Sequence, residues 1–290
     1  MSKYLNNVDA RLQFDIKNIL ENGFKDENPR PKYADQTPAY TYSVNHVVRQ
    51  YDLQKEFPFC TLRGMSWRSA IKEIQWIYQD QTSNLEILKK KYNNHVWDQW
   101  ESKDIPKTIG NRYGHTVKKY NLMDNLLNGL KNDPFGRRHI MDLWQEEELN
   151  SSDGLNPCAF MTTWNVRKNN NEYYLDLVLY QRSGDMLVAS GAGHYNEIQY
   201  ASLLLMVSKH CNYKPGIFTH FVANEQIYDR FYDSAKELLN RKSVFSNPQI
   251  ILDTNKTNFY DFTIDDFKLI NCNMEEINKV NSQIKFEVAI

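Results

Sequence analysis

The strongest constraint on the fold comes from two neighbouring segments that alternate between apolar and polar residues. Residues 159–166 read AFMTTWNV, residues 173–182 read YYLDLVLYQR, and the polar stretch RKNNNE joins them. Alternation with a period of two is typical of β-strands, so the pair predicts an antiparallel β-hairpin. Cys158 precedes the first strand and Arg182 ends the second. The hairpin therefore brings these two residues to the same edge of a sheet.

Apolar residues at helical spacing predict helices on both sides of the hairpin. Residues 66–78 and 121–134 each carry one apolar stripe, as expected of helices that pack on a core. Residues 196–210 are apolar nearly all round, which predicts a buried helix, and residues 259–269 alternate again. The predicted strands and helices do not alternate regularly, as they would in βαβ units. The sequence therefore predicts an α+β fold with a large, mixed, mostly antiparallel sheet flanked by helices, in one domain spanning residues 1–290.

Composition narrows the class of protein. The chain has 35 basic and 36 acidic residues and a net charge of −1, so it offers no global field that attracts nucleic acid or an anionic membrane. Its four cysteines are widely spaced and form no CxxC pair, which argues against a zinc site and a disulfide framework. No signal peptide and no run of about 18 apolar residues is present. We expect a cytoplasmic protein that uses no metal, no membrane and no nucleic acid.

Arginines accompany Cys158 in three places. Arg137 and Arg138 are adjacent at the start of a predicted strand, Arg182 lies in YQRSGD, and Arg30 lies in the proline-bearing loop 27–40. A planar guanidinium suits phosphate, and a nearby guanidinium also favours the thiolate form of a cysteine. The hypothesis is a nucleophilic cysteine beside a phosphate site. The alternative is a buried structural cysteine with solvated arginines.

Several motifs occur together in one order. They are VWDQWE, NRYGH, NDPFGRRHIMDLW, NPCAF, YQRSGD and the tail FYDFTIDDFKLI…FEVAI. With these motifs the chain resembles the thymidylate synthase and pyrimidine nucleotide hydroxymethylase family from about residue 10 to the last residue.

The resemblance implies a covalent mechanism. Cys158 corresponds to the family's nucleophile, whose thiolate adds to C6 of a pyrimidine nucleoside monophosphate. C5 then attacks the methylene carbon of the co-substrate 5,10-methylenetetrahydrofolate. Glu73 corresponds to a buried glutamate that orders water and moves protons near the base. Tyr113 corresponds to a tyrosine that assists removal of the C5 proton.

The resemblance also implies binding residues and a partner. The family's phosphate ligands correspond to Arg30, Arg182, Ser183, Arg137 and Arg138. The last two would reach across a twofold interface into the partner's site. This implies an obligate homodimer in which the sheets of the two subunits pack together.

Folate and sugar contacts follow in the same way. The family's folate contacts correspond to Trp97, Asp185 and the C-terminal Ile290, whose tail closes over the co-substrate. Arg63 stands where a lysine is usual. The sugar contacts correspond to Gln226 and Tyr228.

Two elements depart from the family pattern. Where a thymidylate synthase carries Pro-Phe-Asn, this chain has MLVASGAGHYNEIQY, so the asparagine that reads uracil corresponds either to Asn196 or, without a gap, to Gly193. Where the family has Asp-x-His-x-Tyr, this chain has Asn224, Gln226 and Tyr228. Changes in both the base loop and the sugar element favour a different nucleotide.

Glu197 in the rebuilt loop suggests which nucleotide this is. Cytosine presents an amino donor at C4 and an acceptor at N3, the reverse of uracil, so a carboxylate near that edge suits cytosine. The main interpretation is therefore hydroxymethylation of CMP, or else of dCMP, with CMP favoured because Gln226 stands where the family's deoxyribose-binding histidine would be. In that interpretation His194 faces solvent and has no catalytic role, and the alternative role of Glu197 is a helix cap.

Two other functions stay open. The first is an ordinary thymidylate synthase that methylates dUMP to dTMP and releases dihydrofolate. The second is a non-catalytic paralogue that binds a nucleotide or RNA as a regulator.

Overall fold

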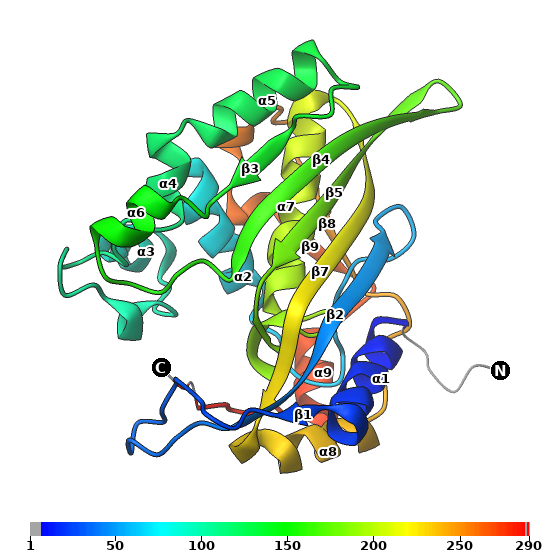
Figure 1. Ribbon diagram of the computed structural model, residues 1–290. Helices are drawn as coiled ribbons and strands as arrows, with labels where there is room; N and C mark the ends of the chain where they lie inside the picture. The colour runs from blue at the N-terminus through cyan, green and yellow to red at the C-terminus, as the bar shows by residue number, and fades with distance from the viewer. Residues whose placement is uncertain (1–6, 288, 290) are drawn as a thin grey trace.

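The computed structural model describes residues 7–287 and 289, and a large β-sheet forms its centre (Figure 1). The strand order is β1-β2-β7-β5-β4-β3, and β6 pairs with β7. The pairs β5–β7 and β6–β7 are parallel, and the other pairs of this sheet are antiparallel. The strands of this sheet are β1 (Phe24–Lys25), β2 (Thr41–Asp52), β3 (Ile140–Asp142), β4 (Ala159–Asn169), β5 (Glu172–Gln181), β6 (Gly184–Asp185) and β7 (Lys214–Tyr228). The predicted mixed, mostly antiparallel sheet is confirmed.

The predicted hairpin is formed by β4 and β5. Asn170 and Asn171 connect the strands, and both have positive φ angles, 47° and 64°. Such a two-residue turn matches the twist of the flanking strands, and asparagine tolerates this conformation better than most residues. Ala159 pairs with Gln181, and the backbone N–H of Arg182 donates to the carbonyl oxygen of Cys158 at 2.9 Å. The hairpin thus fixes Cys158 beside Arg182.

Helices flank the sheet as the sequence predicts. They are α1 (Asn7–Asn22), α2 (Trp67–Ile74), α3 (Leu85–Tyr92), α4 (Gly114–Lys119), α5 (Leu122–Asn132), α6 (Glu146–Ser151), α7 (Tyr195–Cys211), α8 (Tyr232–Asn240) and α9 (Met274–Val280). A π-helical turn over Gln75–Gln79 continues α2, so the predicted helix 66–78 is present but changes its winding. Such turns are frequent at functional sites.

The segment 259–269 differs from the expected strand. It begins with two 3₁₀ turns, Phe259–Asp261 and Ile264–Asp266, and only then enters β9 (Phe267–Ile270), which pairs with β8 (Gln249–Leu252). The buried Phe259 and Phe262 lie three residues apart, which is the repeat of a 3₁₀ turn. The alternating pattern therefore arose partly from turns.

The two faces of the sheet have different surroundings. In Figure 1, α7 lies behind β4, β5 and β7. The strand residues on that side, such as Leu177, Leu179 and Phe218, are fully buried. On the opposite face Tyr180 and Phe221 are half-buried and Val48 is 55% exposed, and in this view no described helix crosses β4, β5 or β7 on the near side. An apolar face left this open is typical of a surface that binds another protein.

Residues 7–287 and 289 contain no helix that combines the length and the apolar character needed to cross a membrane.

Candidate active site

Cys158 lies in the turn that leads into β4, with its side chain partly exposed. The Sγ atom is 3.6 Å from Nη2 of Arg182. The same guanidinium donates to the carbonyl oxygens of Asn156 and Pro157, each at 2.9 Å, and lies over the ring of Trp144. Arg182 therefore braces the turn that presents the cysteine.

The charge state of Cys158 differs from the sequence-based expectation. Burial raises the pKa of the Cys158 thiol, and the charges of Arg182 and Arg30 act in the opposite direction without outweighing it. Before a ligand binds, the thiol form is thus favoured. The two arginines still reduce the free energy needed to form the thiolate.

Aromatic residues close one side of the cysteine. The hydroxyl of Tyr113 accepts a hydrogen bond from the backbone N–H of Cys158 at 3.2 Å. The rings of Trp97 and Tyr113 are 5.2 Å apart, and Trp100 packs on Trp97 at 5.3 Å. Burial raises the pKa of Tyr113 well above its usual value, so the phenol stays protonated. The predicted residues Cys158, Tyr113 and Trp97 thus form one cluster.

Glu73 lies near the end of α2, just before the π-helical turn, with its side chain buried. The hydroxyl of Tyr195 donates to its Oε2 at 3.0 Å. Burial raises the pKa of Glu73, while the side chains of Gln199, Trp97 and Tyr195 favour the carboxylate. A raised pKa makes the protonated form of this carboxyl group easier to reach, as a group that moves protons requires.

The predicted phosphate and sugar residues lie close to one another and to Cys158. Arg30 is exposed, and its charge acts on both Cys158 and Tyr228. The hydroxyl of Ser183 lies 3.4 Å from the Oε1 atom of Gln226 on β7. The structure therefore brings Arg30, Ser183, Gln226 and Tyr228 to the cluster that contains Cys158.

Arg137 and Arg138 lie elsewhere in this protomer. Both are exposed in the turn between α5 and β3, at the edge of the sheet opposite β1 and β2. A role in binding the nucleotide therefore requires a second subunit.

A cleft of about 440 Å³ adjoins Tyr195. Its walls include the apolar side chains of Met65, Val188 and Phe286. Arg63 lines it as well, with its guanidinium over the ring of Phe286 and its buried Nε without a hydrogen-bond partner among the described residues. Apolar walls with an unpaired cationic donor suit an aromatic ligand that carries carboxylates.

Asp185 and the C-terminal tail border this cleft region. The Oδ1 atom of Asp185 accepts the backbone N–H groups of Leu187 and Val188 at 3.1 Å each, and burial raises the pKa of this carboxyl to about 7. Ile290, the remaining predicted folate contact, lies outside the described residues. No group of three or more His, Cys, Asp or Glu side chains within the described residues could hold a metal ion.

Asn196, in the first turn of α7, belongs to a row of three side-chain amides. Its Oδ1 accepts from Nε2 of Gln181 at 3.2 Å, and its Nδ2 donates to Oε1 of Gln199 at 3.0 Å. Gln181 ends the hairpin strand directly before Arg182. Asn196 therefore lies next to the cysteine–arginine pair. Gly193, the other candidate from the sequence, lies in the core.

The structure corrects the role predicted for Glu197. Its side chain is fully buried, and its Oε1 accepts from Nε of Arg49 at 2.7 Å. Its Oε2 accepts from the hydroxyl of Tyr51 and from the backbone N–H of Gly193, each at 2.7 Å. The predicted contact with cytosine is wrong, because both oxygens already have partners in the core. The alternative of a helix cap describes only the contact with the N–H of Gly193, and Glu197 also binds Arg49 and Tyr51.

His194 and Gly193 are buried too. Nδ1 of His194 is 2.8 Å from the carbonyl oxygen of Met186, and burial lowers the pKa of this histidine well below its usual value. The expectation that His194 faces solvent is therefore wrong. Gly193 has a φ of 69°, and a Cβ there would meet the backbone nitrogen of Cys60 at 2.5 Å. The close approach of Gly193 to the Cys60 backbone requires glycine, and it places the loop around Gly193 in the core.

The sequence alone did not predict that Arg49, His220 or Tyr195 belongs to the site. A signal existed for two of them. Arg49 and His220 each occupy an inward position of an alternating strand, where a charged or titratable residue needs a partner.

Three comparisons place the chain among known proteins. The thymidylate synthase family model matches residues 12–290. The thymidylate synthase of Lactococcus lactis subsp. cremoris is 46% identical over 286 residues, which are 98% of this chain and 99% of that protein. The thymidylate synthase of Streptococcus sanguinis is 43% identical over 285 residues, with the same shares of 98% and 99%. Among solved structures, the thermostable thymidylate synthase A from Bacillus subtilis matches with a TM-score of 0.85 at 34% identity, covering 98% of this chain and 99% of its own.

These relatives are named thymidylate synthases and lend no support to a branch of cytosine nucleotide hydroxymethylases.

Proposed function

This chain belongs to the thymidylate synthase family, whose co-substrate is 5,10-methylenetetrahydrofolate, and from that premise we propose that it methylates dUMP to dTMP. The proposal replaces hydroxymethylation of CMP or dCMP, which the sequence alone favoured. Dihydrofolate is the second product.

The burial of Glu197 is the main support for uracil, and not cytosine, as the base of the substrate. With that carboxylate bound to Arg49, Tyr51 and Gly193, the polar group left to meet the base is the amide of Asn196. An amide offers one acceptor and one donor side by side. These match the N3–H and O4 of uracil, provided that the amide keeps its orientation.

Cys158 starts the reaction on the nucleotide. Its Sγ forms a bond to C6, and the electron pair of the C5–C6 double bond makes C5 nucleophilic. Arg182, 3.6 Å from Sγ, stabilises the thiolate while Arg30 and Ser183 bind the phosphate. The folate supplies the one-carbon unit and the hydride.

Tyr113 and Glu73 handle protons around the base. The Tyr113 hydroxyl lies beside the cysteine backbone and acts on water near C5, where a proton must leave. Glu73, with its raised pKa, supplies or accepts a proton at the opposite side of the base.

The cleft beside Tyr195 takes the folate. Met65, Val188 and Phe286 contact its rings, and Arg63 binds a carboxylate of its glutamate portion. Asp185 and Trp97 contact the pterin from the side of the cysteine.

The active form is a homodimer. The open apolar face around Tyr180, Phe221 and Val48 packs on its twofold copy, and Arg137 and Arg138 of each subunit enter the site of the other.

An assay with four nucleotides tests the proposal. Purified protein is mixed with methylenetetrahydrofolate and dUMP, UMP, dCMP or CMP labelled with tritium at C5. We expect tritium release together with a rise in dihydrofolate absorbance with dUMP alone. Tritium release from a cytosine nucleotide without dihydrofolate would establish hydroxymethylation instead. The absence of both signals with every nucleotide would favour a regulator.

A further inference from the structure

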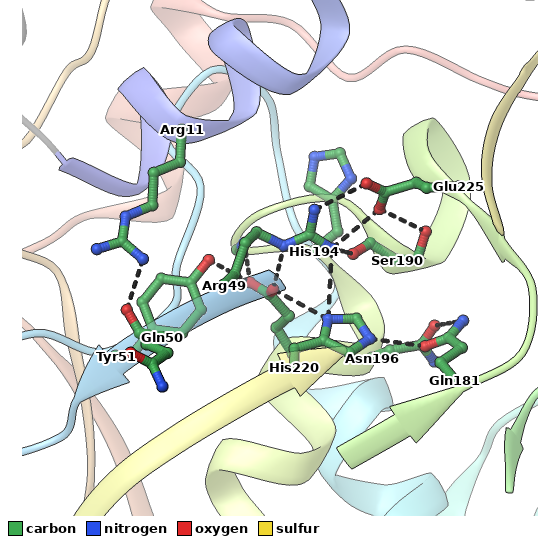
Figure 2. A network of polar contacts seen from close by, with 12 residues as sticks. Arg11, Arg49, Gln50, Tyr51, Gln181, Ser190, His194, Asn196, His220 and Glu225 are labelled. Carbon is green, nitrogen blue, oxygen red and sulfur yellow. Dashed lines mark hydrogen bonds and ion pairs between the residues drawn. The ribbon is translucent and has the colours of Figure 1, made fainter. Parts of the chain in front are cut away.

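A buried cluster of charges lies between the sheet and helices α1 and α7, and Figure 2 shows it together with Asn196. Arg49 of β2 is 3% exposed and stands at its centre. Its Nε donates to Glu197, and its Nη1 donates to Asp15 and Glu225, at 2.7, 2.9 and 2.9 Å. Its Nη2 donates to Glu225 at 2.9 Å and to the carbonyl oxygen of Ser190. One guanidinium therefore faces three carboxyl groups.

Glu197 remains ionised in this cluster. Burial alone would raise its pKa, but the charge of Arg49 and the contacts with His220 and Gly193 bring the pKa to about 2. A carboxylate can only accept hydrogen bonds. Any ring nitrogen that contacts it must therefore carry a proton.

His220 of β7 connects this cluster to the active site. Its Nδ1 is 3.0 Å from Oε1 of Glu197, and its Nε2 is 2.9 Å from Oε1 of Gln181. Nδ1 is therefore protonated. Burial lowers the pKa of His220, while the carboxylates of Glu197 and Glu225 act against that shift. In the arrangement of Figure 2, Nε2 faces the carbonyl oxygen of the Gln181 side chain, so it donates as well. His220 therefore carries both ring protons, a charged form that the carboxylates of Glu197 and Glu225 favour and burial disfavours.

Gln181 cannot turn its amide around without a cost. Its Nε2 donates to the backbone carbonyl of Ser183 at 3.0 Å and to Oδ1 of Asn196 at 3.2 Å. A backbone carbonyl has no donor to offer, so a reversed Gln181 amide would place two oxygens in contact. His220 and Ser183 together hold one orientation of Gln181, and Gln181 then holds one orientation of Asn196.

We propose that His220 is a positioning residue, which sets through Gln181 the orientation of the Asn196 amide that reads uracil and rejects cytosine. The inference rests on the proposed function, since it takes Asn196 as the group that meets the base. Cytosine would require the reversed Asn196 amide, whose Nδ2 would then face Nε2 of Gln181, donor against donor. The buried charges thus contribute to substrate choice as well as to the fold.

Two replacements of His220 separate its two nitrogens. In His220→Gln the side-chain amide reaches the position of Nε2 and can donate to Gln181. In His220→Asn the shorter amide stops near Nδ1 and contacts Glu197 only. Calorimetric binding of dUMP and dCMP to the wild-type protein and both variants gives a ratio of dissociation constants that does not depend on turnover.

We expect the wild-type protein and His220→Gln to bind dUMP much more tightly than dCMP, and the ratio to fall at least about tenfold in His220→Asn. Selective ¹⁵N labelling of histidine provides a second readout, in which the His220 Nε2 resonance is that of a protonated nitrogen. A bare Nε2, or full discrimination in His220→Asn, would overturn the inference.

Tyr51→Phe is the matched control. It removes the hydrogen bond from the Tyr51 hydroxyl to Oε2 of Glu197 but leaves His220 and Gln181 untouched. We expect a lower melting temperature with an unchanged ratio of dUMP to dCMP binding. An equal loss of discrimination in Tyr51→Phe would show that general damage to the cluster, and not His220, is responsible. If the wild-type protein prefers dUMP in binding but forms no dTMP, the proposed function fails while the inference stands.

Discussion

The phenolic oxygen of Tyr113 lies 3.2 Å from the backbone nitrogen of Cys158 and accepts its N–H. Tyr113 adopts φ 49° and ψ −107°, a backbone conformation that non-glycine residues rarely take. Packing against Trp97 holds the ring in place. The protein therefore keeps a strained backbone at the point where a tyrosine meets the nucleophile, as is common at active sites.

Tyr113→Phe tests this contact. We expect kcat to fall roughly 10²-fold with little change in the KM for dUMP, because the variant keeps the ring but loses the hydroxyl that acts near C5. Steady-state kinetics with dUMP and tritium release from C5 measure the effect. Tyr120→Phe, at a half-buried tyrosine at the end of α4, is the control with unchanged kinetics. If Tyr113→Phe lowered Tm, and lowered kcat and tritium release by the same factor, its role would instead be purely structural.

Cys158→Ser should abolish turnover. A hydroxyl is a far weaker nucleophile towards C6, so we expect a loss of roughly 10³-fold or more in kcat. Mass spectrometry of the protein with a 5-fluoropyrimidine nucleotide and folate should find a covalent adduct in the wild-type protein and none in the variant. Cys272→Ser, at a half-buried cysteine, should form the adduct normally. Product formation by Cys158→Ser would contradict the covalent mechanism.

Glu197 should stabilise the fold in a pH-dependent way. Its pKa is lowered from 4.5 to about 2, so its contribution is fully present above pH 4.5 and is lost as the pH falls towards 2. The shift corresponds to about 3 kcal/mol in the free energy of unfolding. Glu197→Gln should therefore be less stable by about that amount at pH 7, and the difference should shrink at pH 3.

Urea unfolding at a fixed protein concentration measures this difference. Glu237→Gln, at an exposed carboxylate paired with Arg241, is the control, with a change within about 0.5 kcal/mol. A difference between Glu197→Gln and the wild-type protein that does not vary with pH would show that the carboxylate charge is not the cause.

The C-terminal segment is held by Arg230. Its guanidinium donates to Glu287 at 2.7 Å and to Asp35 at 2.6 Å, and the backbone N–H of Ala34 donates to Glu287 at 3.2 Å. The same guanidinium lies 3.8 Å from the centre of the Tyr33 ring. One arginine therefore ties the tail to the loop that carries the proposed phosphate ligand Arg30.

Glu287→Gln should weaken this attachment. We expect the KM for methylenetetrahydrofolate to rise roughly threefold to fivefold, because a solvent-exposed ion pair contributes only modestly to tail closure. The KM for dUMP should change less, and high salt should reduce the difference from the wild-type protein. Asp233→Asn, which breaks the exposed pair with Lys236, should leave both KM values unchanged. A rise in the KM for dUMP alone would contradict a role in holding the tail.

Mixing two inactive variants tests the contribution of the partner subunit. Cys158→Ser lacks the nucleophile, and a double variant, Arg137→Ala with Arg138→Ala, lacks the two arginines offered to the partner. After the subunits exchange, each mixed dimer holds one complete site, so we expect roughly a quarter of the wild-type activity. No recovery with proven exchange would place these arginines outside the partner's site.

The sequence predicted the parts of the site that depend on local pattern. The alternation in β4 and β5 and the Asn170–Asn171 turn bring Cys158 and Arg182 together, because the hairpin register follows from neighbouring residues. The helical stripe over residues 66–78 likewise predicted the helix that carries Glu73.

The sequence misassigned residues whose partners are distant along the chain. Glu197 looked like a base contact because it stands beside Asn196, yet its partner Arg49 is 148 positions away. The loop around Gly193 and His194 looked exposed from its glycines and polar residues, and it is buried because Gly193 packs directly on the backbone of Cys60.

The sequence by itself determined the strands, the main helices, the nucleophile and its arginine, since period and motif are written along the chain. Only the tertiary structure showed that the Glu197 carboxylate is bound in the core and is not free to contact a ligand. That outcome depends on which buried charges the sheet brings together, and a low-dielectric core leaves no ionised group without a partner. Arg49 binds Glu197, and His220 contacts both Glu197 and Gln181. Asn196, which contacts Gln181, is then the residue that we propose to contact the base.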